Sequence, residues 1–140
     1  MSLPSETIVG VLKAKGLRVT PQRFSVYELL LARDDHPTAE QMLTELNRDR
    51  PVLSQATVYS ALQALREAGL VREVLLEEGV SRYDANVERH HHFHCRECGA
   101  IADITWDTFS CVDLNRLPAG LHGEEYEITV QGTCDRCRAE

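Results

Sequence analysis

The chain has 140 residues, of which 43% are apolar and 26% charged, which is the composition of a soluble globular protein with one or two small domains. No apolar run approaches the roughly 20 residues that cross a bilayer, and the start, MSLPSETIVG, lacks the basic and apolar layout of a signal peptide. We therefore expect a cytoplasmic protein without a membrane segment.

The net charge of −7 comes from the second part of the chain. Residues 1–75 contain nine Lys and Arg against nine Asp and Glu, whereas residues 76–140 contain six against thirteen. A surface that binds DNA would therefore be local and would lie in the first half.

The first half of the sequence predicts four short helices, because apolar residues recur at helical spacing behind residues that favour helix starts. The expected N-caps are Ser5, Thr20, Thr38 and Ser54. Pro21 suits the first position of the second helix, where its missing N–H costs nothing, and Gln41 would complete a capping box with Thr38. Gly16 and Gly69 are the expected stops of the first and fourth helices.

The segment LVREVLLEEGVSRYDA follows the fourth helix and predicts two strands around a turn at Glu78 and Gly79. Helices followed by a hairpin predict a winged helix-turn-helix domain over residues 1–84. In such a domain the fourth helix is the one placed in the major groove of DNA.

After Asn86 the pattern changes to that of a smaller α/β unit. HHHFHC, AIADITW and EYEITVQGTC resemble strands, and a helix is expected near Thr108–Leu117. We predict an α/β domain over residues 90–140, joined to the first domain by a hinge at residues 85–89. The expected fold class is α+β.

The strongest chemical signal is a pair of CxxC motifs, formed by Cys95, Cys98, Cys134 and Cys137. Each CxxC turn lets two thiolates converge on one ion, and two such turns complete the tetrahedral sulfur cage of a structural zinc site. A redox dithiol is an alternative, disfavoured because no helix follows the second motif to lower a thiol pKa. Cys111 has no partner and is expected to be a small buried apolar residue in the predicted helix.

The histidines of HHHFHC would be divided between two faces if the segment is a strand. One face would carry His90, His92 and His94, and the other His91, Phe93 and Cys95. Two imidazoles at i and i+2 can reach one ion, and the nearest carboxylates are Asp84 and Asp103. Such a mixed nitrogen and oxygen site suits Fe²⁺ or Mn²⁺. The alternative is a set of solvated histidines on a polar strand.

Taken together, these segments resemble the ferric uptake regulator family, whose members include iron, manganese, zinc, nickel and peroxide-responsive repressors. The resemblance rests on GLRVTPQR, SQATVYSALQALREAGLV, RYDANVERHHHFHCRECG and TCDRC, and runs from Gly16 to Cys137. It implies a winged-helix domain joined by a hinge to an α/β dimerisation domain. It also implies a cytoplasmic homodimer that represses transcription at pseudo-palindromic operator DNA.

The resemblance assigns two sets of metal ligands. The structural Zn²⁺ positions are matched by Cys95, Cys98, Cys134 and Cys137. The positions of a regulatory Fe²⁺ or Mn²⁺ site are matched by His36, Asp84, His90, His92 and Asp103. In this assignment His36 and Asp84 tie the DNA-binding half to the dimerisation half.

Two positions favour the peroxide-responsive branch of the family. The last regulatory ligand in that branch is an aspartate, as Asp103 is here, where iron-uptake regulators typically carry glutamate. The zinc-sensing branch often has a cysteine near the hinge position held here by Asp84, which argues against zinc sensing.

The remaining histidines match no complete site. Some family members have a further site, but Ser110 and Tyr126 stand where its acidic and histidine ligands would be, so His91 lacks partners. His94 and His122 match no ligand position and are expected to be solvated.

Binding of metal at the regulatory site is expected to close the hinge and set the spacing of the dimer's two recognition helices. If the ion is Fe²⁺, peroxide would modify a ligand histidine, with His36 or His90 as the expected target, and DNA would be released. The candidate DNA contacts are Arg18, Arg23, Ser54, Gln55, Thr57 and Tyr59. A half-buried core position is the alternative for Tyr59.

Several other functions stay open at this point. One is an iron or manganese uptake regulator without peroxide sensing, and another is a zinc-uptake regulator. A metalloenzyme is less consistent, because no base or nucleophile is evident beyond the ligands, and we predict no enzymatic activity. A zinc-stabilised protein-interaction module would leave His36, Asp84 and Asp103 unexplained.

Overall fold

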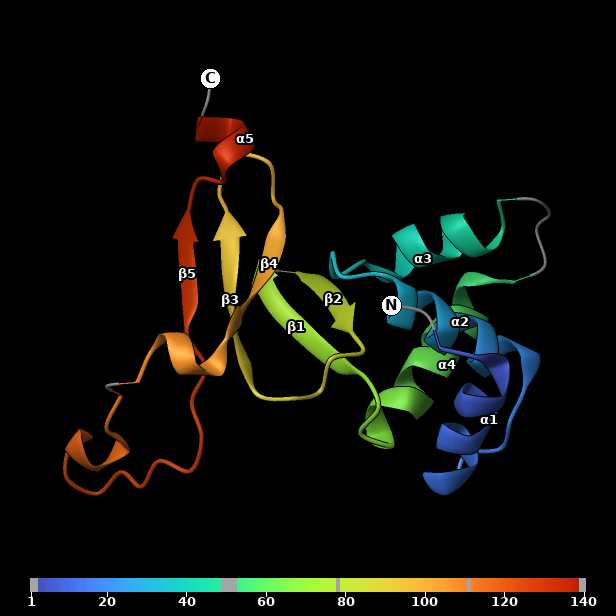
Figure 1. The fold of residues 1–140 in the computed structure, drawn as a ribbon, viewed down its shortest axis with the longest axis horizontal. Helices are drawn as coiled ribbons and strands as arrows, with labels where there is room; N and C mark the ends of the chain where they lie inside the picture. The colour runs from blue at the N-terminus through green and yellow to red at the C-terminus, as the bar shows by residue number, and fades with distance from the viewer. Residues whose placement is uncertain (1–2, 49–52, 78, 111, 139–140) are drawn as a thin grey trace. The chain divides into compact units, whose positions relative to one another are not determined.

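The computed structural model describes residues 3–48, 53–77, 79–110 and 112–138 (Figure 1). It contains two compact units, Met1–Val87 and Glu88–Glu140. The boundary between them falls within residues 85–89, and the action of these residues as a hinge stays a prediction. The presence of both helices and strands confirms the predicted α+β class.

The first unit begins with four helices, and the sequence explains where three of them start. They are α1 (Ser5–Ala14), α2 (Pro21–Ala32), α3 (Ala39–Leu46) and α4 (Gln55–Glu67). The caps at Thr20, Thr38 and Ser54 are confirmed, because each side-chain oxygen accepts a hydrogen bond from the backbone N–H three residues later, at 3.2 Å. The capping box is complete, since the Gln41 side chain accepts from the Thr38 N–H at 2.9 Å.

The predicted cap at Ser5 is wrong, because the N-cap of α1 is Pro4 and no side chain caps this end. The φ of Pro4, −58°, already suits a helix, and its carbonyl accepts hydrogen bonds from the N–H groups of Thr7 and Ile8. The predicted helix stops are confirmed. Gly16 and Gly69 follow α1 and α4 with φ of +77° and +79°, a left-handed conformation that glycine adopts without strain.

A single apolar core holds the four helices together. Its most buried members are Ile8, Leu12, Val26, Leu30, Met42, Val58, Leu62 and Leu65. Every helix contributes to this set from one face, which leaves the polar face of α4 available to solvent. None of the described helices is both long enough and apolar enough to span a bilayer.

A two-stranded antiparallel hairpin completes the first unit. β1 (Arg72–Glu77) pairs with β2 (Val80–Asp84), as predicted. Glu78 of the expected turn lies outside the described residues. β2 is also joined to the loop before α3, because the Tyr83 N–H donates to the Pro37 carbonyl at 3.0 Å. Helices followed by this hairpin form the predicted winged helix-turn-helix.

The second unit is built on a three-stranded sheet with β3 in the centre (Figure 1). Its strands are β3 (His90–Cys95), β4 (Ile101–Thr105) and β5 (Thr129–Gly132), and a short helix α5 (Asp135–Arg138) follows. β4 pairs antiparallel and β5 parallel to β3. The parallel pairing returns the end of the chain to the end of β3, where the first CxxC motif begins.

The predicted helix near Thr108–Leu117 is wrong for the described part of that segment. In its place are two short 3₁₀ turns, η1 (Trp106–Thr108) and η2 (Leu114–Arg116). The Asp113 carboxylate accepts a hydrogen bond from the Asn115 N–H at 2.9 Å, so it starts a new turn where a helix would have to continue. Cys111, which was expected to be buried in this helix, lies outside the described residues.

Candidate metal centres and DNA-contacting surface

The four cysteines of the CxxC motifs come together at one end of the second unit. Each offers a sulfur atom, and these atoms all lie within 4.8 Å of one another. The Sγ atoms of Cys98 and Cys134 are 3.8 Å apart. A tetrahedral zinc with Zn–S bonds of about 2.3 Å separates its sulfur ligands by about 3.8 Å. The cluster therefore fits a zinc ion in both its donor type and its size.

The surroundings of this cluster favour thiolates on the first CxxC motif. Backbone N–H groups of Cys98 and Cys134 lower the pKa of Cys95 to about 6. The Ala100 N–H and the Arg136 guanidinium, which donates to the Cys98 Sγ at 3.6 Å, lower the pKa of Cys98. A hydrogen bond to Cys134 raises the pKa of Cys137 to about 12. A bound cation would favour the thiolate form of Cys137 against this effect.

Strand alternation on β3 places His90 and His92 on one face, as predicted, with ring centroids 4.6 Å apart. Asp103 lies opposite His92 on β4. Its Oδ1 is 3.3 Å from the Nε2 of His90 and 3.7 Å from the Nε2 of His92. Metal bonds of about 2.1 Å would hold neighbouring ligand atoms at about 3 Å or slightly more. These three side chains therefore form a nitrogen and oxygen donor set of suitable size.

The His90 ring is held in one tautomer by the backbone carbonyl of Glu88. Its Nδ1 is 2.6 Å from the Glu88 carbonyl oxygen. A carbonyl can only accept, so Nδ1 carries the proton and the lone pair of the neutral ring is on Nε2, which faces Asp103. Histidines that bind metals commonly have their second ring nitrogen engaged in this way.

In the first unit, His36 and Asp84 form a second buried pair. The His36 Nε2 lies 3.2 Å from the Asp84 Oδ2, and the Asn86 N–H donates to Oδ1 of the same carboxylate at 2.9 Å. The backbone of His36 has φ +55°, which is the left-handed region that few residues other than glycine adopt. Arg82 of β2 donates to the His36 carbonyl at 3.2 Å and helps to hold this conformation.

His91 is held in the opposite tautomer from His90. The Ile128 N–H donates to the His91 Nδ1 at 3.0 Å, so in the neutral ring the proton is on Nε2 and no lone pair remains for a metal. The ring stacks on Trp106 with centroids 4.4 Å apart, and the Arg89 guanidinium lies 4.0 Å from the centre of the Trp106 ring. His91 therefore belongs to an aromatic cluster.

His122 and His94 were both expected to be exposed to solvent, and this expectation holds only for His122. His122 is exposed, as expected. His94 is only 9% exposed, so the prediction that it is solvated is wrong. The alternation of side chains along β3 correctly predicts that His94 lies on the same face as His90. It does not predict that other residues shield this face from solvent.

The predicted DNA-contacting residues lie around the start of α4 and the start of α2. Gln55 and Tyr59 are exposed on α4, and Tyr59 is 39% exposed, which contradicts a core position for it. The Ser54 and Thr57 hydroxyls hydrogen-bond to each other at 2.8 Å. The Arg23 guanidinium donates a hydrogen bond to the Arg18 carbonyl at 2.9 Å, so these two residues lie side by side in the first unit.

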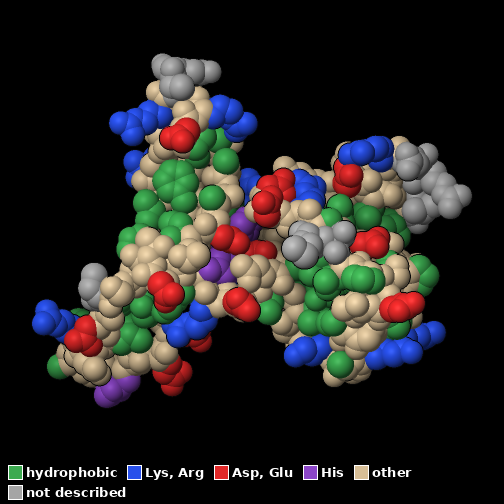
Figure 2. Space-filling model, in the orientation of Figure 1, with side chains coloured by type: hydrophobic (Ala, Val, Ile, Leu, Met, Phe, Trp, Pro, Cys, Tyr) green, Lys and Arg blue, Asp and Glu red, His purple; other side chains and the backbone are tan. Residues whose placement is uncertain are grey.

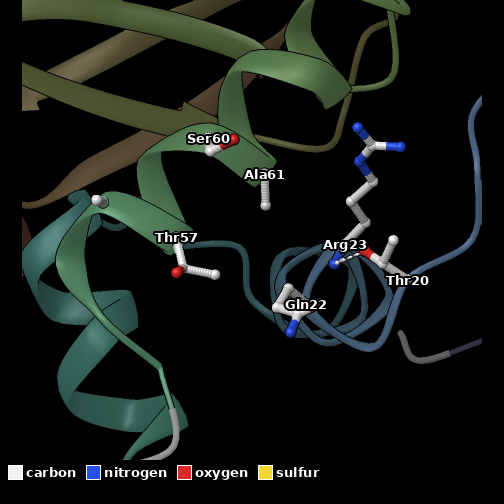
Figure 3. A pocket seen from close by; sticks show the side chains of 7 residues that line it. Thr20, Gln22, Arg23, Thr57, Ser60 and Ala61 are labelled. Atoms are coloured by element: carbon white, nitrogen blue, oxygen red, sulfur yellow. Dashed lines mark hydrogen bonds between the residues drawn. The ribbon is translucent and has the colours of Figure 1, made fainter.

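A groove of about 350 Å³ runs between the two helix starts. Figure 3 shows Thr57 and Ser60 of α4 on one side, with Thr20, Gln22 and Arg23 on the other. Gln22 and Ser60 were missed in the sequence. Ser60 lies three residues after Thr57, and this helical spacing was the available signal.

Another missed residue is Glu40 of α3, which accepts a hydrogen bond from the Tyr59 hydroxyl at 2.8 Å. This bond raises the pKa of Tyr59 and lowers that of Glu40. On the face drawn in Figure 2, Lys and Arg side chains gather along the lower edge of the helical unit.

Comparison with known proteins gives a consistent match over most of the chain. The sequence model of the ferric uptake regulator family matches residues 14–130. A peroxide-responsive repressor PerR of Staphylococcus aureus is 30% identical over 138 residues, which are 95% of this chain and 90% of that protein.

Solved structures share the fold. The ferric uptake regulator from Francisella tularensis with iron has a TM-score of 0.75 at 22% identity, and the match covers 88% of this chain and 96% of that one. The Helicobacter pylori ferric uptake regulator Fur has a TM-score of 0.73 at 18% identity, over 97% and 95% of the two chains.

Proposed function

Because the chain belongs to the ferric uptake regulator family, we propose that it is a metal-dependent repressor that binds operator DNA as a homodimer in the cytoplasm. It is a transcriptional regulator and not an enzyme. The proposal has four parts, which are a structural zinc site, a regulatory metal site, a DNA-reading helix and release by peroxide.

The structural zinc site consists of Cys95, Cys98, Cys134 and Cys137. Their mutual distances and the lowered thiol pKa values of the first motif support this assignment. When bound, zinc supplies no redox chemistry and links the end of β3 to the segment around α5.

The regulatory site is proposed to consist of His36, Asp84, His90, His92 and Asp103. The observation that carries this proposal is that each unit presents a histidine Nε2 close to a carboxylate oxygen, at 3.2 Å for His36 and Asp84 and at 3.3 Å for His90 and Asp103. This donor set suits Fe²⁺ or Mn²⁺. The backbone contact of His90 keeps its lone pair on Nε2.

Ligands from both units would make DNA binding depend on the metal. His36 and Asp84 belong to the unit that carries α4, whereas His90, His92 and Asp103 belong to the other. Joint coordination therefore favours one arrangement of the two units over the others, by the difference in their metal affinity. In a dimer, this arrangement would set two α4 helices one turn of DNA apart over a pseudo-palindrome.

Within the DNA-reading part, α4 is proposed to enter the major groove. Gln55 and Tyr59 would contact bases, while the Ser54 and Thr57 hydroxyls would lie near phosphates. Arg18 and Arg23, at the start of α2, supply positive charge for the backbone. Glu40 orients the exposed Tyr59 hydroxyl.

The central test is metal-dependent binding to selected DNA. A labelled fragment would be selected from a random pool by the Mn²⁺-loaded protein, and its binding measured by fluorescence anisotropy with Mn²⁺, Fe²⁺ without oxygen, or Zn²⁺. With Mn²⁺ or Fe²⁺ we expect the fragment to bind about 10³-fold or more tightly than unrelated DNA. Protein that carries only the structural zinc should show no such preference. Equal binding with and without added metal would contradict the proposal, and activation by Zn²⁺ alone would indicate a zinc-uptake regulator.

Peroxide sensing is the final part of the proposal. Fe²⁺ supplies the redox chemistry that activates hydrogen peroxide. One oxygen atom of hydrogen peroxide would be inserted into a ring C–H bond of His36 or His90 to give a C–OH group, and the other oxygen would leave as water. The oxidised ring is a poorer ligand, so the metal and DNA are lost together. Support comes from the identity to the peroxide-responsive repressor and from the aspartate at position 103.

Peptide mass spectrometry tests this step directly. After peroxide treatment of the Fe²⁺-loaded protein, we expect the peptide that contains His36 or His90 to gain one oxygen atom as DNA binding is lost. The Mn²⁺-loaded protein, treated in parallel, should remain unmodified. Unmodified peptides together with intact DNA binding would leave an iron or manganese uptake regulator without peroxide sensing.

A further inference from the structure

Residues 126–128 run beside β3 and contact two of its histidines in succession. The Ile128 N–H donates to the His91 Nδ1, and the Ile128 carbonyl accepts from the His92 N–H, both at 3.0 Å. Tyr126 stacks on the His91 ring, with centroids 6.0 Å apart. This segment therefore lies in register with β3 immediately before β5 begins.

The alternation of an extended chain separates the side chains of this segment. Tyr126 is on the His91 side, whereas Glu127 is on the side of His92, where its Oε1 lies 2.8 Å from the His92 Nδ1. This is a close contact between a carboxylate and an imidazole, without the direction of a hydrogen bond. The opposite ring nitrogen, Nε2, is the one that faces Asp103, at 3.7 Å. Glu127 thus contacts the His92 ring from the end away from Asp103.

We propose that Glu127 is a positioning residue for the regulatory metal. Its carboxylate, beside Nδ1, favours the His92 tautomer that has the proton on Nδ1 and the lone pair on Nε2. A carboxylate attracts the proton of a neutral imidazole to the nitrogen that it faces. It also makes the other nitrogen a stronger donor. This inference rests on the proposed regulatory site, but it also predicts the tautomer of the His92 ring in protein without regulatory metal.

The comparison with His90 shows why Glu127 matters. His90 is fixed in the same tautomer by the backbone carbonyl of Glu88, which no side-chain substitution removes. At His92 the group beside the same ring nitrogen is a side chain, the Glu127 carboxylate. The strength of the regulatory site can therefore be changed at residue 127 without replacing any ligand.

The sequence EEYE supplies a matched control next to this residue. Glu125 and Glu127 are both exposed and carry the same charge, but it is Glu127 that lies beside the His92 ring. Glu125→Ala therefore removes one negative charge from the same segment without removing the contact to His92. Glu127→Gln removes the charge but keeps a side-chain oxygen that can accept the Nδ1 proton.

The experiment uses full-length protein that carries the structural zinc, with histidine labelled in ¹⁵N. Two-bond ¹H–¹⁵N spectra of the protein without regulatory metal report the tautomer of each ring. Free Mn²⁺, followed by electron paramagnetic resonance during a titration, gives the affinity. Zinc content and far-UV circular dichroism show whether each variant is folded.

In the wild-type protein we expect His92 to carry its proton on Nδ1. Glu127→Ala should shift the ring toward the Nε2-protonated form and weaken Mn²⁺ binding about 10- to 100-fold. Glu127→Gln should keep the wild-type tautomer and recover most of the affinity, and Glu125→Ala should match the wild type.

A Glu127→Ala protein with the wild-type tautomer and unchanged Mn²⁺ affinity would overturn the inference. So would equal losses in Glu127→Ala and Glu125→Ala, because the effect would then be one of net charge. If Glu127→Ala does not fold, Glu127→Leu, which also has no acceptor oxygen, takes its place in both measurements. A wild-type protein that binds no Mn²⁺ would instead contradict the proposed function, while the spectra still test the tautomer.

Discussion

Replacing Cys95 with serine is expected to unfold the second unit and to leave the helices of the first unit folded. Cys95 is fully buried, and it is the first of the four sulfurs of the zinc cluster. Structural zinc contributes about 10–16 kcal/mol in small domains, which is as large as the whole stability of a typical domain. Among the described residues after Val87, the only other buried apolar side chain is Ile101. The second unit therefore has little apolar core with which to replace the metal.

Zinc analysis and limited proteolysis check this expectation. The Cys95→Ser protein should lose its zinc, and protease should remove the chain after the first unit while a fragment with α1 to α4 persists. Cys111→Ser, which changes the cysteine outside both CxxC motifs, is the control and should keep its zinc. A Cys95→Ser protein that retains zinc and resists protease would show that the second unit does not depend on this cluster.

Replacing His92 with alanine should abolish the dependence of DNA binding on the regulatory metal. His92 is fully buried, and its Nε2 faces the Asp103 carboxylate. Loss of a residue that only supports a ligand weakens metal binding about 10- to 100-fold, so loss of the ligand itself should weaken it by more than about 100-fold. The structural zinc should be retained, because side-chain alternation along β3 puts Cys95 on the face opposite His92.

Titration of selected DNA with Mn²⁺, by anisotropy, measures the effect. We expect no rise in affinity for the His92→Ala protein at Mn²⁺ concentrations that saturate the wild type. His122→Ala replaces an exposed histidine and should behave as the wild type does. A normal response of His92→Ala to Mn²⁺ would remove His92 from the regulatory site.

Much of this architecture could be read from local sequence signals, because those signals act over a few residues. The caps at Thr20, Thr38 and Ser54 depend on hydrogen bonds to backbone three residues away. The grouping of His90 with His92 follows from the two-residue period of a strand. The convergence of the CxxC motifs followed from the preference of zinc for four thiolates.

The features that were missed depend on contacts between segments far apart in the sequence. Glu127 reaches His92 only because residues 126–128 run beside β3, and this register is set by the parallel pairing with β5. The opposite tautomers of His90 and His91 likewise depend on a carbonyl and an N–H that no spacing rule identifies. The helix expected at Thr108–Leu117 failed because the Asp113 side chain competes with helical hydrogen bonding.

The backbone of His36 carries a consequence for the evolution of this protein. A left-handed conformation costs a residue with a Cβ about 1–2 kcal/mol relative to glycine. At position 36 the backbone conformation favours glycine, whereas the proposed regulatory site requires the histidine ring. Glycine would relieve this cost, but it would also remove a buried ring that lies 3.2 Å from the Asp84 carboxylate. If His36 is a ligand of the proposed regulatory site, any mutation that makes the backbone at position 36 easier to fold by removing the ring also removes the response to metal.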